Sequence, residues 1–184
     1  MTFNPNIHQR RSIRLKGYDY TQSGMYFITL CIQDKDCLFG EIRNSEMILN
    51  EAGNMINKWW SKIPEKFINI ELDVFQIMPN HFHAIIINNN TEGANPCVRP
   101  EVPNPGFVNN KKVSLSDIVQ WFKTMSTNEY IKGVKIHGWV PFNGKLWQRN
   151  YYDHIIRNEK SYDKISDYII NNPYNWEEDR FYNK

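Results

Sequence analysis

Apolar and polar positions along the chain follow two different periods, one typical of strands and the other of helices. Residues 26–32 (YFITLCI) are continuously apolar, β-branched or aromatic, which indicates a buried strand. A short hairpin is predicted at 39–49, where two apolar stretches flank the polar residues 43–46. Further strands are predicted at 72–78, at 81–87 and, as an aromatic extended segment, at 146–156.

Three helices are predicted, and each has a capping residue in front of it. Asn50 precedes the first helix, which Pro64 is expected to end. Ser114 and Asp117 resemble a capping box that opens the second, and Asn158 caps the third, which Pro173 stops. The apolar positions recur every three or four residues, at Ala52, Met55, Ile56, Trp59, Trp60 and Ile63, then at Leu115, Ile118, Val119, Phe122 and Met125, and finally at Tyr162, Ile165, Tyr168 and Ile169.

The order of these elements predicts the fold class. Strand, hairpin, helix, two strands, helix, strand and helix fit an α+β protein, a ferredoxin-like antiparallel sheet with helices packed on it. We expect one domain over residues 1–184, since this length suits a single hydrophobic core. Residues 88–112 are rich in asparagine and proline and are expected to form an inserted exposed loop.

Composition narrows the class of protein. A net charge of +2 with 14% aromatic residues argues against disorder, and we find neither a membrane span nor a secretory signal. The three cysteines, Cys31, Cys37 and Cys97, have no spacing typical of zinc ligands or of a disulfide framework. We therefore expect a reduced cytoplasmic protein.

Positive charge is concentrated at the start of the chain. Arg10, Arg11, Arg14 and Lys16 lie within residues 1–17, which contain no acidic residue. Such a basic arm can bind phosphates, and a solvated tail is the alternative interpretation.

His81 and His83 are the strongest candidates for chemistry. Residues two apart in a strand share a face, so the two lie roughly 6.6 Å apart at the backbone and their imidazoles can converge on one divalent ion. They are two of only five histidines, and burying both without a partner would be costly. We expect them to bind a cation on an exposed face of the sheet. Two imidazoles do not identify the metal.

Tyr168 and Asn172 form a second candidate pair near the C-terminus. They are four residues apart on the last predicted helix, about 6 Å along its axis, and can reach the same ion or phosphate. The alternative is that Tyr168 is a core aromatic beside Ile165 and Ile169.

Together these segments resemble a known family. Residues 78–83 (MPNHFH) match the HUH motif of the single-tyrosine transposases, two histidines that flank a hydrophobic residue. Residues 147–157 (WQRNYYDHIIR) and 167–173 (DYIINNP), with the start at 10–15 and 26–29, are similar to the REP-associated tyrosine transposases. The resemblance covers most of residues 10–174 apart from the loop at 88–112.

The resemblance implies a nuclease domain that cleaves and rejoins single-stranded DNA through a 5′-phosphotyrosine. It implies that His81 and His83 are metal ligands for Mg²⁺ or Mn²⁺, Tyr168 the nucleophile and Asn172 a third ligand. The partner would be single-stranded DNA with hairpin-forming ends, acted on in the cytoplasm near the nucleoid by a monomer or a homodimer. Residues expected to bind DNA are Arg10, Arg11, Arg14, Lys16, Trp147, Arg149, His154 and Arg157.

Several alternatives remain open at this point. Tyr151 and Tyr152 offer rival nucleophiles, and Asp153 with His154 could be a buried structural pair. The whole protein could be a domesticated hairpin-binding protein without turnover, or a metal-dependent hydrolase of small molecules.

Overall fold

The computed structural model describes residues 15, 17–90 and 112–182. Arg10, Arg11, Arg14, Lys16 and most of the expected 88–112 loop lie outside the described residues. The strands are β1 (Gly24–Cys31), β2 (Gly40–Arg43), β3 (Glu46–Leu49), β4 (Ile70–Ile77), β5 (His81–Asn88) and β6 (Tyr152–Ile156). The α-helices are α1 (Glu51–Ser61), α2 (Ile63–Lys66), α3 (Leu115–His137) and α4 (Glu159–Ile170), and short 3-10 turns occur at Gln33–Lys35 and Trp176–Glu178.

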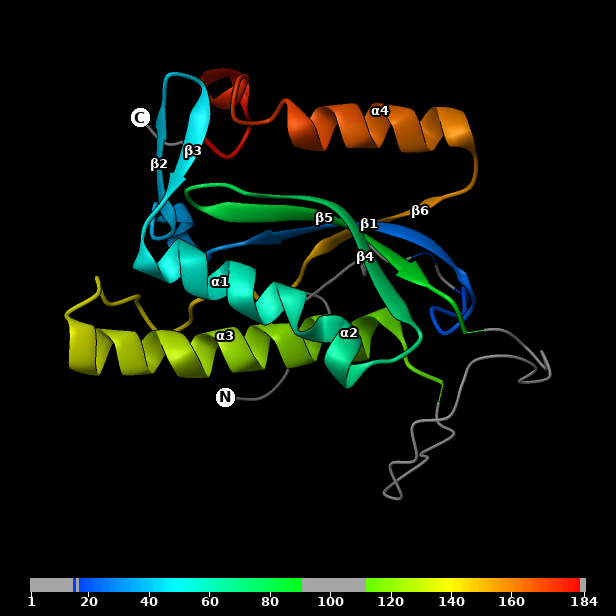
Figure 1. Ribbon diagram of the computed structural model, residues 1–184, viewed down its shortest axis with the longest axis horizontal. Helices are drawn as coiled ribbons and strands as arrows, with labels where there is room; N and C mark the ends of the chain where they lie inside the picture. Colours follow the sequence, from blue (N-terminus) through cyan, green and yellow to red (C-terminus); the bar gives the residue numbers. More distant parts are fainter. Residues whose placement is uncertain (1–14, 16, 91–111, 183–184) are drawn as a thin grey trace, which may run out of the picture.

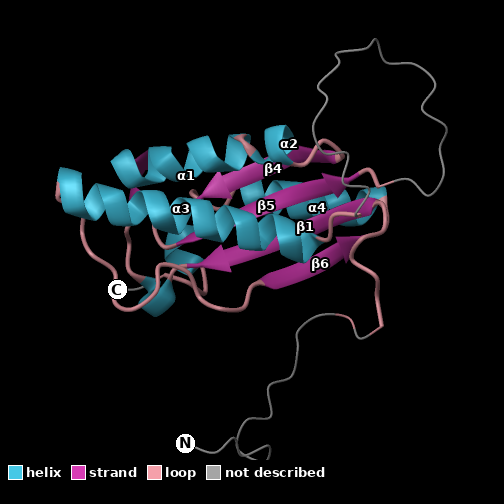
Figure 2. Cartoon of the chain, turned by 90° about the horizontal axis from the view of Figure 1, so that it is seen from below, coloured by secondary structure: helices cyan, strands magenta, loops and turns pink. Residues whose placement is uncertain are grey.

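A four-stranded antiparallel sheet forms the centre of the molecule. Its strand order is β4-β5-β1-β6, and β2 pairs with β3 as a separate hairpin. Helices cover both faces, with α1, α2 and α3 on one side and α4 on the other (Figures 1 and 2). The strand-helix-strand-strand-helix-strand core with this order is the ferredoxin-like arrangement, which confirms the fold class predicted from the sequence.

The main hydrophobic core lies between the sheet and the helices α1 and α3. Alternate residues of β1 and β5 point into it because side chains in a strand alternate between the two faces. Phe82 of β5 contacts Trp60 of α1, with ring centroids 4.6 Å apart, and Phe122 of α3 at 5.7 Å. The same alternation directs His81 and His83 to the opposite face, toward α4.

A smaller apolar cluster fixes α4 on that opposite face. Phe27, Ile85, Ile156 and Ile169 are buried there. The Tyr162 hydroxyl group donates a hydrogen bond of 2.9 Å to Asp73, which ties the first half of α4 to β4. This cluster determines how far the C-terminal half of α4 stands from the two histidines.

The helix caps agree with the prediction from sequence. The side chains of Asn50 and Asn158 accept hydrogen bonds from Gly53 and Ser161, and Ser114 with Asp117 forms a full capping box. Pro64 differs from the expectation, since α1 stops at Ser61 and Pro64 lies in the first turn of α2. Proline is tolerated there because the first amide groups of a helix have no partner within it.

The predicted extended segment 146–156 is only partly a strand. β6 covers Tyr152–Ile156, and Trp147 forms an isolated bridge with Ile32. Among the described residues, no helix combines the length and the apolar character needed to cross a membrane.

Candidate metal centre and nucleophile

His81 and His83 stand side by side on β5 and face α4. Their ring centroids are 4.5 Å apart, and across β1 they pair with Cys31 and Thr29. Both side chains are fully buried, at 0% exposure, so the expectation of an exposed sheet face is wrong. The cause is the C-terminal segment, whose Phe181 ring lies 4.6 Å from that of His81.

The side chain of Asn80 determines which nitrogen of His81 carries the proton. Its amide group donates to the backbone carbonyls of Lys35 and Phe181, at 3.1 and 2.8 Å. Its carboxamide oxygen, 2.8 Å from Nδ1 of His81, must therefore accept the hydrogen bond. Nε2 of His81 is then an unprotonated acceptor, and it is buried with no hydrogen-bond partner among the described residues.

His83 links the sheet to the last helix. Its Nδ1 atom lies 2.9 Å from the Thr29 hydroxyl group, and its Nε2 atom lies 3.2 Å from the hydroxyl group of Tyr168. Thr29 is the cross-strand neighbour of His83, so the regular register of β1 and β5 supplies this contact. A partner on the second ring nitrogen is typical of a histidine that is oriented to bind a metal.

The structure brings Tyr168 and Asn172 to this site, as their spacing allows. Tyr168 is 42% exposed, and its ring contacts those of His83 and Phe27. Asn172 is buried, donates from its amide group to Asp179 at 3.0 Å, and has no hydrogen-bond partner for Oδ1 among the described residues. Its oxygen is therefore a second buried acceptor beside His81.

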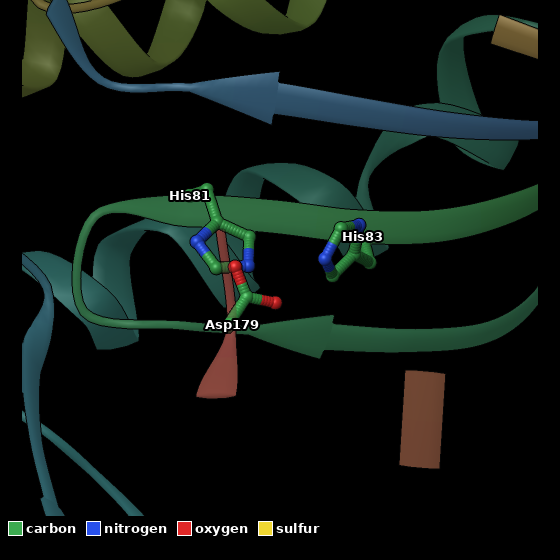
Figure 3. Close-up of side chains that lie close together, drawn as sticks. All are labelled: His81, His83 and Asp179. Carbon is green, nitrogen blue, oxygen red and sulfur yellow. The ribbon is translucent and has the colours of Figure 1, made fainter. Parts of the chain in front are cut away.

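Asp179 completes the cluster, and the sequence analysis did not single it out. The carboxylate of Asp179 lies with the nitrogens of His81 and His83 so that all three ligand atoms are within 4.8 Å of one another (Figure 3). It also accepts hydrogen bonds from the backbone amide of Phe181 at 2.7 Å and from the Tyr168 hydroxyl group at 3.4 Å. Within the acidic run at 177–179, nothing in the local sequence distinguishes this residue from its neighbours.

Burial sets the protonation of the site. It lowers the pKa of His81 to about 4, against the opposing effects of Asp179 and Asn172, and it lowers the pKa of His83 well below the ordinary value. Both imidazoles are therefore neutral near pH 7, the form that binds metal ions. Burial and then Asp179 raise the pKa of Tyr168 to about 12, so the phenol keeps its proton in the metal-free protein.

Two nitrogens and a carboxylate converge here, with an amide oxygen close by, and the donors fit a divalent cation. His81 and Asn172 present acceptor atoms in a buried space without a hydrogen atom to share, and a cation satisfies both. This mixed nitrogen and oxygen set suits Mn²⁺, Mg²⁺ or Zn²⁺. The cluster is therefore a candidate site for a divalent cation.

The rival tyrosines occupy different positions. Tyr151 packs against the main core and lies under the ammonium group of Lys123, 5.4 Å from its ring centroid. Tyr152 is on the α4 face, 6.0 Å from the ring of Phe27. The hydroxyl group that contacts His83 belongs to Tyr168, which favours this residue over both rivals.

Other predicted site residues lie apart from the cluster. Asp153 is buried and His154 is exposed, and as neighbours in β6 they point to opposite faces, so they are not a buried pair. Trp147 is 4% exposed and donates from its indole nitrogen to Ser126 at 3.0 Å. The ring therefore belongs largely to the core, and Trp147 is not the exposed aromatic residue that we expected on a DNA-binding surface. Arg149 and Arg157 are exposed.

Fold and site together define a class: a ferredoxin-like α+β protein with two buried histidines, a half-buried aspartate close to them and a tyrosine in contact with the cluster. The chain belongs to the same family as an uncharacterized protein of Haemophilus influenzae, to which it is 43% identical over 190 residues, with 98% of this chain and 97% of that protein covered. No family model matches the sequence.

Among solved structures, a REP-associated tyrosine transposase bound to a REP hairpin has a TM-score of 0.55 at 18% identity. The alignment covers 89% of this chain and 74% of that one. A protein from Deinococcus radiodurans R1 aligns over 86% of this chain and 95% of its own, at 18% identity and a TM-score of 0.46. The first comparison confirms at the level of the fold the resemblance that the sequence motifs indicated.

Proposed function

We propose that this protein cleaves and rejoins single-stranded DNA through a covalent bond to Tyr168, as a transposase-like enzyme that uses a divalent cation. The observation that carries the proposal is the position of the Tyr168 hydroxyl group, 3.2 Å from Nε2 of His83 and 3.4 Å from the carboxylate of Asp179. The fold shared with a REP-associated tyrosine transposase supports it. The hairpin bound by that protein suggests a hairpin-bearing single strand as the substrate here.

His81, His83 and Asp179 would hold the cation, Mg²⁺ or Mn²⁺, with the Asn172 oxygen as a further donor. When bound, such a cation supplies positive charge that stabilises the phosphate oxygens of the transition state and lowers the pKa of a nearby phenol. Asn80 and Thr29 keep the two imidazoles in the orientation in which Nε2 faces the cluster.

Tyr168 is the nucleophile in this proposal. Its phenolic oxygen forms a bond to phosphorus while the bond from phosphorus to the 3′ oxygen breaks, and the phenolic proton passes to the carboxylate of Asp179. The departing 3′ oxygen takes a proton from solvent, and Asp179 returns the phenolic proton to solvent, so the step leaves a 5′-phosphotyrosine, a free 3′-hydroxyl group and an ionised Asp179 with no net change in protons. In the reverse step a 3′-hydroxyl group attacks the phosphotyrosine, so rejoining needs no nucleotide cofactor.

A denaturing gel tests this mechanism directly. An end-labelled hairpin oligonucleotide with single-stranded flanks is incubated with the protein and Mn²⁺, and we expect a band of covalent adduct. Tyr168→Phe keeps the ring and its packing and should remove the adduct, whereas Tyr174→Phe, a change at an exposed tyrosine, should retain it.

The rivals are tested on the same gel. An adduct that survives Tyr168→Phe but is lost in Tyr151→Phe or Tyr152→Phe would move the nucleophile to that residue. Tight hairpin binding by the wild-type protein with no adduct under any metal condition would favour the hairpin-binding alternative without turnover.

A further inference from the structure

A large open cavity with a mixed polar and apolar lining lies on the α3 side of the sheet, opposite the face that carries His81 and His83. It has a volume of about 830 Å³ and lies between α3 and the segment 142–151 that leads into β6. This volume is in the range of roughly 300–1,000 Å³ that is typical of ligand sites. The mechanism proposed above assigns no role to it.

The lining of the cavity has the chemistry of a nucleic-acid site. Lys123, Lys145 and Arg149 line it, and none of the lining residues is acidic. Three amide side chains, Gln120, Asn128 and Gln148, also line the cavity. Cations suit phosphates, and amides can donate to and accept from the edges of bases.

Hydrogen bonds join the wall of the cavity to β1, the strand that pairs with the histidine-bearing strand β5. The backbone amide of Gln148 donates to the carbonyl of Cys31 at 2.9 Å, and the Lys123 ammonium group donates to the Gln148 carbonyl at 2.9 Å. Cys31 in turn pairs with His81 across β1 and β5.

Tyr151 and Tyr152 are neighbours at the start of the edge strand β6, and their side chains lie on opposite faces of the sheet. Tyr151 lines the cavity, while Tyr152 lies on the α4 face and pairs with Thr29, the neighbour of His83. Three adjacent strands thus place Tyr152 and His83 about 10 Å apart at the backbone. Each ring has a cation beside it, Lys123 at 5.4 Å from Tyr151 and Arg180 at 5.9 Å from Tyr152.

We propose that this cavity holds the single-stranded DNA flanking the scissile phosphate, and that the strand passes over the Tyr151–Tyr152 edge to the metal centre. Lys145 and Arg149 contact its phosphates, and the tyrosine rings stack on bases, a contact that every base can make. This inference rests on the proposed function, because it assigns a path to the strand that Tyr168 attacks.

Binding measured without cleavage tests the path. Fluorescence anisotropy in the presence of a chelator compares a labelled hairpin that has an eight-nucleotide single-stranded flank with the same hairpin lacking the flank. The double variant Lys145→Gln, Arg149→Gln should bind the flanked hairpin at least about tenfold more weakly. The slope of log affinity against log salt should fall by about 1.4, because each phosphate of a single strand that is no longer neutralised contributes about 0.7. The hairpin without a flank should change less than twofold.

A matched control lies on the same helix. Lys132→Gln, Lys135→Gln removes two exposed charges of α3 that do not line the cavity and should leave both affinities within twofold. An equal loss for the two hairpins, or an equal effect of the control pair, would overturn the proposal. In addition, 5-iododeoxyuridine in the flank should photo-crosslink to Tyr151 or Tyr152, and crosslinks confined to other elements would refute the path.

The two proposals fail in different ways. Flank-dependent binding through Lys145 and Arg149 without any adduct would reject the phosphotyrosine mechanism and keep the cavity as a single-strand site. If the variant Lys145→Gln, Arg149→Gln forms the Tyr168 adduct and binds the flanked hairpin as the wild-type protein does, the proposed function stands. The proposed path of the single strand through the cavity is then rejected.

Discussion

Binding of a divalent cation should stabilise the folded protein, independently of any DNA. In the metal-free state Nε2 of His81 is a buried acceptor without a hydrogen-bond partner among the described residues, and such a group costs about 1–3 kcal/mol. A cation bound between His81, His83 and Asp179 satisfies it. Because the unfolded chain does not hold these groups together, binding shifts the unfolding equilibrium toward the folded state.

The size of the effect follows from mass action. At a metal concentration of about 100 times Kd, the gain in the free energy of unfolding is about 2.7 kcal/mol. For a domain of about 150–250 residues each kcal/mol raises Tm by about 2–4 °C, so we expect an increase of about 5–11 °C. Differential scanning calorimetry of the protein with Mn²⁺ and with excess chelator measures it.

Asp179→Asn keeps the shape of the side chain and removes its charge. Loss of a residue that hydrogen-bonds to a metal ligand typically weakens metal affinity about 10–100-fold, and loss of a charged ligand should do at least as much. At the metal concentration used for the wild-type protein, a 100-fold weaker Kd leaves about 0.4 kcal/mol, or about 1–2 °C. Each variant is compared with its own baseline in chelator, which removes any direct effect of the substitution on stability.

Asp163→Asn, at an exposed position on α4, is the matched control and should retain the full increase in Tm. The reasoning is refuted if Mn²⁺, Mg²⁺ and Zn²⁺ all leave the wild-type Tm unchanged up to millimolar concentration. It is also refuted if Asp179→Asn gains as many degrees as the wild-type protein, since the cation would then bind elsewhere.

Three further outcomes are expected. Tyr162→Phe removes the 2.9 Å hydrogen bond to Asp73 and should lower the free energy of unfolding by about 1 kcal/mol in urea titrations; an unchanged value would mean that the bond does not hold α4 on β4. Gly53→Ala should cost about 1–3 kcal/mol by the same assay, because its new Cβ would clash with the backbone carbonyl of Phe39, and a neutral result would show that α1 shifts freely. Replacing the three arginines within residues 10–14 by alanine should lower the salt slope of DNA binding by about one unit for each duplex phosphate that the arm neutralises, and a constant slope would show that it neutralises none.

Local rules in the sequence were enough to predict most of the helices and strands and which candidate residues share a face. Asn50, Ser114 and Asn158 identified the helix starts because a cap satisfies amide groups within the same short segment. The two-residue period of strands placed His81 and His83 on one face. The four-residue spacing of Tyr168 and Asn172 likewise follows from the pitch of a helix.

Contacts between distant segments were decided only by the tertiary structure. The sequence did not indicate that Asp179 joins His81 and His83, or that the segment around Phe181 buries them, because both depend on how the chain returns across the sheet after α4. The same reason applies to Trp147, whose aromatic character fits a DNA surface and a core equally well. Its burial against α3 is determined by the packing of segments that no local pattern relates to each other.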